Sequence, residues 1–371
     1  MDTTPTPEPE AAAAPSTATG SAAATPEAGL RFDRQLGNAA KALLIVAVAV
    51  YLLQTFALVL QQLCTAALIG YLIVPAHHWL VRHRISPLLS SVVMIVVTLA
   101  CFSVLGNMIY SSVEDLSGKI PGYQDNLINL IHRATARVPG LDVGGIEKAV
   151  RGELPVFQSS FGMLRTALGS LFGFLSQGVV VLVYLIFLLA EQATVQQRIL
   201  NAFGTEGSPQ IMAIVGRINA SITQYLAVKT CMGLIAGFLT WLVLSLFGVD
   251  YAVLWGVLAF LLNYIPYLGS MVATVLPVLL ALVQLGDLWQ PLVILAALLL
   301  MQNAIGYAIE PRIAGKRLNL SPLVIILSLA FWGSLWGIVG MILAVPLVVV
   351  IKTVLENIPA TKPIAVLLSN V

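Results

Sequence analysis

The chain has 371 residues, of which 58% are apolar and only 10% are charged, with 19 Lys and Arg against 17 Asp and Glu. Soluble domains carry about a quarter charged residues, so a water-soluble globule of this size could not cover its surface. This composition excludes an ordinary cytosolic enzyme and a nucleic-acid-binding protein, which needs a basic stripe. It predicts an all-α membrane protein.

The N-terminal third is predicted to hold a tail followed by three membrane helices. Residues 1–29 consist almost entirely of Ala, Pro, Thr, Ser and Glu and cannot bury enough apolar surface to order themselves, so we expect a disordered tail. Residues 30–110 contain three apolar runs, each near the roughly 20 residues that a span requires. These runs cover about 42–60, 63–80 and 88–109.

The middle of the chain alternates polar and apolar segments, and we predict a role for each. The expected segments are an extracytoplasmic polar helical region at 111–165, a fourth membrane helix at 166–190, a cytoplasmic amphipathic segment at 191–229, and full crossings at about 230–247 and 291–309. Residues 354–371 then form a cytoplasmic tail.

Two long apolar blocks do not fit a single straight helix. The first, 251–284, contains Pro266 and Gly269, which remove a backbone donor and permit a turn, so the helix is predicted to break there. The second, 321–351, contains Gly333 and Gly337 at its middle. Each block is predicted to form two half-helices that meet at a tip.

The distribution of Lys and Arg predicts the topology. The short connections after the second and sixth crossings are basic, whereas 249–250 and 285–290 carry no Lys or Arg. The positive-inside rule then places both termini in the cytoplasm. Each broken block must leave on the side from which it entered, either as a re-entrant hairpin or as a pair of short crossings. Helix plus hairpin therefore occurs at 230–284 and at 291–353 with opposite orientation, which is the pattern of an inverted-repeat transporter.

No catalytic motif is present. The sequence contains no Gly-rich phosphate-binding loop of the P-loop type, no HExxH and no GxSxG, so we expect neither an enzyme nor ATP-driven transport. His77, His78 and His83 have no Asp, Glu or Cys within ten residues, so we expect no metal site and no cofactor. The remaining possible functions are gradient-driven transport, facilitated diffusion and a channel.

Polar residues in apolar surroundings are the candidates for a substrate or ion pathway. A helix break inside a membrane exposes backbone groups that suit an ion or a polar solute, although a simple structural turn is the alternative. Glu310 with Arg312 is a candidate gate or ion pair, or else marks a helix end among lipid headgroups. The full candidate set is Asn263, Pro266, Gly269, Ser270, Gln302, Asn303, Glu310 and Arg312, with Gly333, Ser334 and Gly337 at the second tip.

A small-residue motif lies in the fifth crossing. Gly233 and Gly237 form a GxxxG pattern, which permits close helix packing within one subunit or between subunits. Sliding of one helix past another is the alternative function.

The residues also resemble a known family. The segments 263–269 (NYIPYLG) and 310–316 (EPRIAGK) are similar to those of the autoinducer-2 exporter family of bacterial membrane proteins. The likeness continues through 320–324 (LSPLV), 331–333 (FWG) and 340–346, and includes Pro75 with Trp79 and Leu80. It covers about residues 40–355, without the tail.

The resemblance implies an inner-membrane transporter with about eight membrane segments, six crossings plus two hairpins. It also implies a ring-like homo-oligomer, a pentamer, embedded in the lipid bilayer. The family name implies export of autoinducer-2, and other members resemble sodium/proton antiporters. Because Asp250 and Asp287 lie at predicted helix ends, Glu310 is the candidate titrating group for such exchange. The sequence thus predicts an exporter of a small polar metabolite, with a sodium/proton antiporter or a partner-docking membrane protein as alternatives.

Overall fold

The computed structural model describes residues 26–135, 177–314, 320–359 and 361–369, together with Gly162, Thr166, Gly169 and Gly173. Within this described part every element is a helix, and Leu320 and Ser369 make an isolated bridge. The predicted all-α class is confirmed. The chain divides into two units, Met1–Thr55 and Phe56–Val371.

The first unit contains one described helix, α1 (Pro26–Thr55). It begins at Pro26, inside the range predicted as a tail, and the rest of that range lies outside the described residues. The expected helix at 42–60 is interrupted at Phe56, where α2 (Ala57–Arg82) starts. Large apolar side chains of α1, such as Leu43 and Ile45, are exposed, as expected of a helix that faces lipid.

The chain is a multi-pass membrane protein. Among the described residues six helices are long and apolar enough to span a bilayer, or seven if one bent pair is counted. The six are Ala57–Arg82, Pro87–Leu116, Gly207–Leu246, Leu268–Leu285, Trp289–Ile309 and Pro322–Asn357, and the bent pair is Gly178–Glu191 with Thr194–Thr205 at 61°. The count of eight segments stays a prediction.

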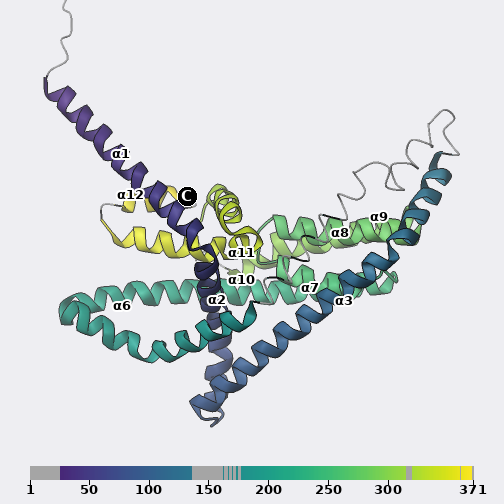
Figure 1. The fold of residues 1–371 in the computed structure, drawn as a ribbon, viewed down its shortest axis with the longest axis horizontal. Helices are drawn as coiled ribbons and strands as arrows, with labels where there is room; N and C mark the ends of the chain where they lie inside the picture. Colours follow the sequence, from purple (N-terminus) through teal and green to yellow (C-terminus); the bar gives the residue numbers. More distant parts are fainter. Residues whose placement is uncertain are drawn as a thin grey trace, which may run out of the picture. The chain divides into compact units, whose positions relative to one another are not determined.

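Helix α3 (Pro87–Thr135) is 49 residues long and continues without a break from the third apolar run into the polar region (Figure 1). The remainder of the region predicted at 111–165 lies almost entirely outside the described residues. A membrane span uses only about 20 of the residues in such a helix, so α3 has a long polar extension.

Helix α6 (Gly178–Leu246) joins three predicted segments into one element. It bends between Glu191 and Thr194, and Gly204 breaks its helical geometry with φ 67°. The residues from Gly207 to Leu246 then form one continuous 40-residue stretch. The range predicted as a cytoplasmic segment therefore continues directly into the fifth crossing.

Two helices, α7 (Ala252–Leu262) and α8 (Leu268–Leu285), form a hairpin. The predicted break is present at 263–267, where Tyr267 has φ 61°. At the base, the Gln284 amide donates to the carbonyl of Gly248 at 2.9 Å and accepts from the backbone N–H of Asp250 at 2.7 Å. The two ends of the hairpin are thus tied together.

The second apolar block is also folded back on itself. Helix α11 (Pro322–Asn357) loses helical geometry at Gly337, which has φ 63°, a conformation that glycine adopts readily. The Ser328 hydroxyl donates to the Ala344 carbonyl at 3.1 Å, and both residues are buried. Because these residues lie on opposite sides of Gly337, the two arms of α11 pack side by side.

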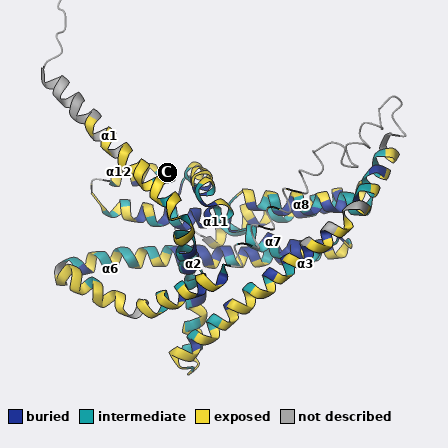
Figure 2. Ribbon diagram, viewed as in Figure 1, coloured by how far each residue is buried: buried dark blue, intermediate teal, exposed yellow. Residues whose placement is uncertain are grey.

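The hairpin α7–α8 is packed into the core through glycine contacts with α6. A Cβ atom on Gly237 would lie 2.6 Å from the carbonyl oxygen of Gly256, and one on Gly233 would lie 3.0 Å from that of Phe260. The GxxxG motif therefore packs α6 against α7 within the chain. Figure 2 shows buried residues concentrated on α7 and the adjoining parts of α6 and α8.

The polar extension of α3 holds the base of this hairpin. Lys119 and Tyr123 donate to the same carboxylate oxygen of Asp250, at 2.9 and 2.7 Å, and Asn126 donates to the Gln284 carbonyl at 3.1 Å. Burial disfavours the charged form of Asp250, but the hydrogen bonds from Lys119 and Tyr123 outweigh it and hold its pKa below the usual value.

Asp250 is expected to make the stability of the protein depend on acid pH. Because its folded-state pKa is lowered, its contribution is present above the ordinary aspartate pKa, about 3.9, and is lost as pH falls through the folded value. We expect Asp250→Asn to cost about 1 kcal/mol at neutral pH and to match the native protein once the pH is below the folded-state pKa of Asp250. Thermal unfolding in detergent measures both, and an equal deficit at both pH values would contradict this assignment.

Candidate functional site

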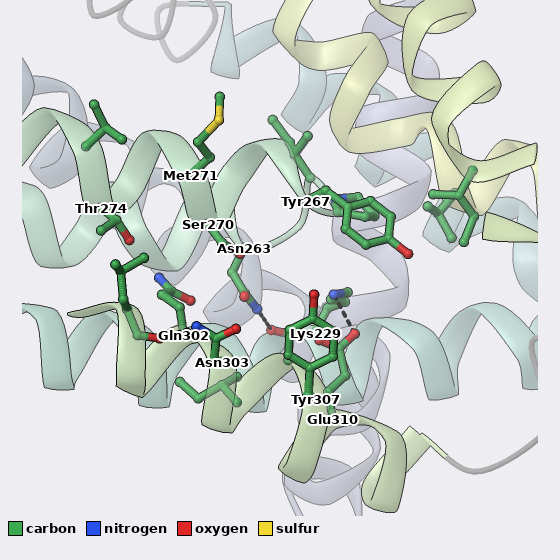
Figure 3. A pocket seen from close by; sticks show the side chains of 18 of the residues that line it. Lys229, Asn263, Tyr267, Ser270, Met271, Thr274, Gln302, Asn303, Tyr307 and Glu310 are labelled. Atoms are coloured by element: carbon green, nitrogen blue, oxygen red, sulfur yellow. Dashed lines mark hydrogen bonds and ion pairs between the residues drawn. The ribbon is translucent and has the colours of Figure 1, made fainter. Parts of the chain in front are cut away.

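A cavity of about 930 Å³ lies between the first hairpin tip, α6 and the sixth predicted helix (Figure 3). The sixth helix is built from α9 (Trp289–Asn303), a π-helix η1 (Ala304–Ile309) and α10 (Glu310–Ala314). Ile325 and Val345, one from each arm of α11, also line the cavity. Both broken blocks therefore contribute to one site.

The hairpin tip is docked on α6 by hydrogen bonds, one of which satisfies a backbone carbonyl at the break. Asn263 donates its amide to the backbone carbonyl of Lys229 at 3.3 Å. The Tyr225 hydroxyl donates to the Tyr264 carbonyl at 3.3 Å, and the hydroxyls of Tyr264 and Thr230 are 2.7 Å apart. A helix break within a membrane protein requires such partners.

The π-helix widens the sixth helix directly beside the cavity. Isolated π-turns inside α-helices occur frequently at functional sites. Here the irregular segment lies between Gln302 and Asn303 on one side and Glu310 on the other, and Tyr307 within it also lines the cavity. Sequence reasoning did not predict this distortion, although Gly306 lies within the segment and Pro311 has no N–H to donate to the Tyr307 carbonyl four residues earlier.

An ion pair links the two walls of the cavity. The ammonium nitrogen of Lys229 lies 2.5 Å from a carboxylate oxygen of Glu310, and the two side chains are 9% and 26% exposed. Lys229 thus contributes its side chain to Glu310 and its backbone carbonyl to Asn263. One residue of α6 therefore connects the hairpin tip with the sixth helix.

The positive-inside argument counts Lys229 among the basic residues of the cytoplasmic segment at 191–229. The structure instead buries it in the continuous helix Gly207–Leu246. A signal was available, because Lys229 is flanked by Tyr225-Leu-Ala-Val and Thr230-Cys-Met without another charge. An ionisable residue inside an apolar helix marks a functional site by default.

Most of the predicted pathway residues meet in this cavity. Those that line it are Asn263, Pro266, Ser270, Gln302, Asn303 and Glu310. Gly269 is buried at the tip but is not among the lining residues, and Arg312 is exposed. Glu310 is paired with Lys229, whereas the sequence suggested Arg312 as its partner. The second-tip residues Gly333, Ser334 and Gly337 do not line the cavity, and Ser334 donates to the Phe331 carbonyl at 2.8 Å.

The cavity has an amide-rich part and a charged part. Figure 3 shows the side chains of Asn263, Gln302 and Asn303 close together, and Lys229 and Glu310 beside Tyr307. Ser270 and Thr274 add hydroxyls from α8. Amides and hydroxyls both donate and accept hydrogen bonds, so this lining suits a polar solute. Within the described residues no group of three His, Cys, Asp or Glu could hold a metal ion.

Comparison with known proteins identifies the family. Residues 42–360 match the AI-2E family transporter profile. The chain belongs to this family. The match spans both hairpins and every described residue of the cavity. Members of the AI-2E family are transport proteins, and the composition and the membrane helices of this chain agree with that role.

Individual relatives cover most of the chain. The AI-2 transport protein TqsA of Escherichia coli is 33% identical over 311 residues, which are 82% of this chain and 88% of TqsA. YhhT of Escherichia coli is 29% identical and covers 84% of this chain and 88% of its own length. A protein of Borreliella burgdorferi is 28% identical, with coverage of 84% and 85%. The likeness therefore extends over most of the length of each relative.

Proposed function

We propose that this AI-2E family member is a secondary transporter of a bacterial inner membrane that exports a small polar metabolite of the autoinducer-2 type. The observation that carries the proposal is the cavity in which a broken-helix tip meets amide and hydroxyl side chains. The name of TqsA, an AI-2 transport protein with 33% identity, supports the substrate class. Broken helices that meet at a polar site are the usual architecture of secondary transporters.

The proposed mechanism uses the two hairpins as moving parts. A polyhydroxylated solute would exchange hydrogen bonds with water for hydrogen bonds with Asn263, Gln302 and Asn303. The first hairpin contributes the tip, and the second contributes Ile325 and Val345. We propose that the two helix-plus-hairpin units are inverted repeats and that movement of one against the other exposes the cavity alternately to each side.

A sodium/proton antiporter is the second candidate. The observation that favours it is the carboxylate of Glu310, which lines the cavity and could exchange a proton if its pairing with Lys229 opened. In that case the solute cavity would be an ion pathway. The two candidates differ in what crosses the membrane, so one experiment separates them.

Flux in proteoliposomes tests the proposal. Purified protein is reconstituted at matched density, and autoinducer-2 loss is followed under an imposed proton or sodium gradient. We expect gradient-dependent loss that empty vesicles lack. Sodium-dependent proton movement without loss of autoinducer-2 would favour the antiporter. The absence of both activities would contradict both candidates.

The proposed orientation has both termini in the cytoplasm. A single cysteine at Asp287, between α8 and α9, is expected to be labelled from outside. A single cysteine at Lys362, at the start of α12 (Lys362–Leu367), is expected to be labelled from inside. Labelling of Asp287→Cys only from the cytoplasm would contradict this orientation.

The pentameric homo-oligomer is also part of the proposal, and light scattering that detected only a 39.5 kDa protein mass would oppose it.

A further inference from the structure

We propose that the Lys229–Glu310 pair is the charge filter of the cavity, which keeps the site electrically neutral so that it favours neither cationic nor anionic solutes. This inference rests on the proposed function in one respect, that solutes pass through this cavity. Its electrostatic content can be tested without any transport.

The charges of the cavity balance. Among the described residues that line it, Lys229 is the one basic side chain and Glu310 the one acidic side chain, and the remaining polar members are amides, hydroxyls and phenols. Their charged atoms are 2.5 Å apart. Two opposite charges at that separation act as a dipole, whose potential falls off faster with distance than that of a single charge.

Each charge of the pair is also compensated by its partner. A solute carboxylate that approached Lys229 would also meet the negative charge of Glu310, and a solute ammonium group that approached Glu310 would also meet the positive charge of Lys229. The lysine side chain is 9% exposed, so complete displacement of Glu310 would leave a largely buried charge without its partner, which is strongly unfavourable. Ionic solutes therefore gain little net attraction from the pair, whereas an uncharged solute can use Gln302, Ser270 and Thr274 without disturbing it.

A purely structural role for the pair makes a different prediction. If the pair only ties α6 to α10 and its charges do not act on solutes in the cavity, removing one charge lowers stability but leaves the preference of the cavity for anions or cations unchanged. If the pair is a filter, neutralising Glu310 gives the cavity a net positive charge and neutralising Lys229 gives it a net negative charge. The relative entry of cationic and anionic reagents distinguishes the two roles.

The test measures thiol modification of Ser270→Cys, a residue of the cavity wall on α8. The background carries alanine at the native positions Cys64, Cys101 and Cys231. Three methanethiosulfonate reagents are used, one cationic, one anionic and one neutral. Gln290→Cys, an exposed site at the start of α9, gives the reference ratio of cationic to anionic rates.

With the native pair, we expect the ratio at Ser270→Cys to lie within about threefold of the reference. Glu310→Gln is expected to shift the ratio toward the anionic reagent by about tenfold or more, and Lys229→Gln to shift it as far toward the cationic reagent. Lys229→Gln with Glu310→Gln should return it to the native value. Unchanged ratios in both single variants, or a native ratio far from the reference, would overturn the proposal.

A second variant covers the case in which breaking the pair unfolds the protein. The neutral reagent would reveal such unfolding, because it would lose its selectivity for the folded site. Gln302→Glu adds an acid to the cavity wall and leaves both partners in place. We expect a shift toward the cationic reagent of about tenfold. No shift would overturn the filter. Failure of the autoinducer-2 flux test with these ratios intact would instead remove only the proposed function.

Discussion

Replacing Gly269 by alanine is expected to abolish transport, although the change adds only one methyl group. A Cβ atom at this position would lie 1.8 Å from the carbonyl oxygen of Leu262, at the end of α7. Because that atom belongs to the backbone of the hairpin tip, the clash cannot be relieved by a side-chain rotation. Overpacking a close contact costs about 1–3 kcal/mol even among side chains, so the tip must change shape.

Flux and membrane insertion are the measurements for this variant, with Gly216→Ala as its control. Gly216 is also helical, and a Cβ there would meet no heavy atom within 4 Å, so we expect normal flux. Gly269→Leu should be as inactive as Gly269→Ala. Pro266→Ala should be milder, because it returns an amide donor to the turn without a collision. Normal flux from Gly269→Leu would reduce the tip to a structural turn.

Neutralising Lys229 alone is expected to destabilise the protein by about 3–5 kcal/mol, because Glu310 then keeps a charge without its partner. Replacing both residues, as Lys229→Gln with Glu310→Gln, should cost less than the sum of the two single changes. Chemical unfolding in detergent measures the four corners of this cycle. Purely additive effects would show that the pair contributes no coupling energy.

The exposed pair of Arg198 with Glu191 is the matched control. Its atoms are 2.9 Å apart, but the side chains are 64% and 54% exposed, so Glu191→Gln should change stability by less than about 1 kcal/mol.

The Glu310→Gln variant also tests whether transport is coupled to protons. If Glu310 titrates during transport, Glu310→Gln retains solute binding but loses the response to a proton gradient. An unchanged response would remove Glu310 from proton coupling.

The sequence predicted the break of the first block because proline and glycine act locally on the backbone. Pro266 lies within the turn at 263–267, whereas Gly269 lies in the first turn of α8 and permits the close approach to the Leu262 carbonyl. Membrane-span composition likewise predicted the all-helical class. The polar residues Gln302 and Asn303 were found because unpaired amides are costly in an apolar helix, whether or not their partners are known.

The rest depends on contacts between segments far apart in the chain. Glu310 and Arg312 are neighbours in sequence, but the packing of α6 against the sixth helix brings Lys229 to Glu310 instead. The same packing buries Lys229, which the sequence alone placed in a cytoplasmic amphipathic segment. The π-helix at 304–309 was not predicted, although Gly306 and Pro311 both weaken an α-helix locally. The junction of the two cavity walls was therefore missed.

The central claim is that the cavity at the first hairpin tip is the transport pathway, and blocking it chemically tests that claim most directly. Ser270→Cys protein without its native cysteines is reconstituted, and autoinducer-2 flux is measured before and after modification with a bulky neutral thiol reagent. Flux is expected to fall in proportion to the modified fraction, while modification of Gln290→Cys leaves it unchanged. Full flux after complete modification of Ser270→Cys would contradict the account.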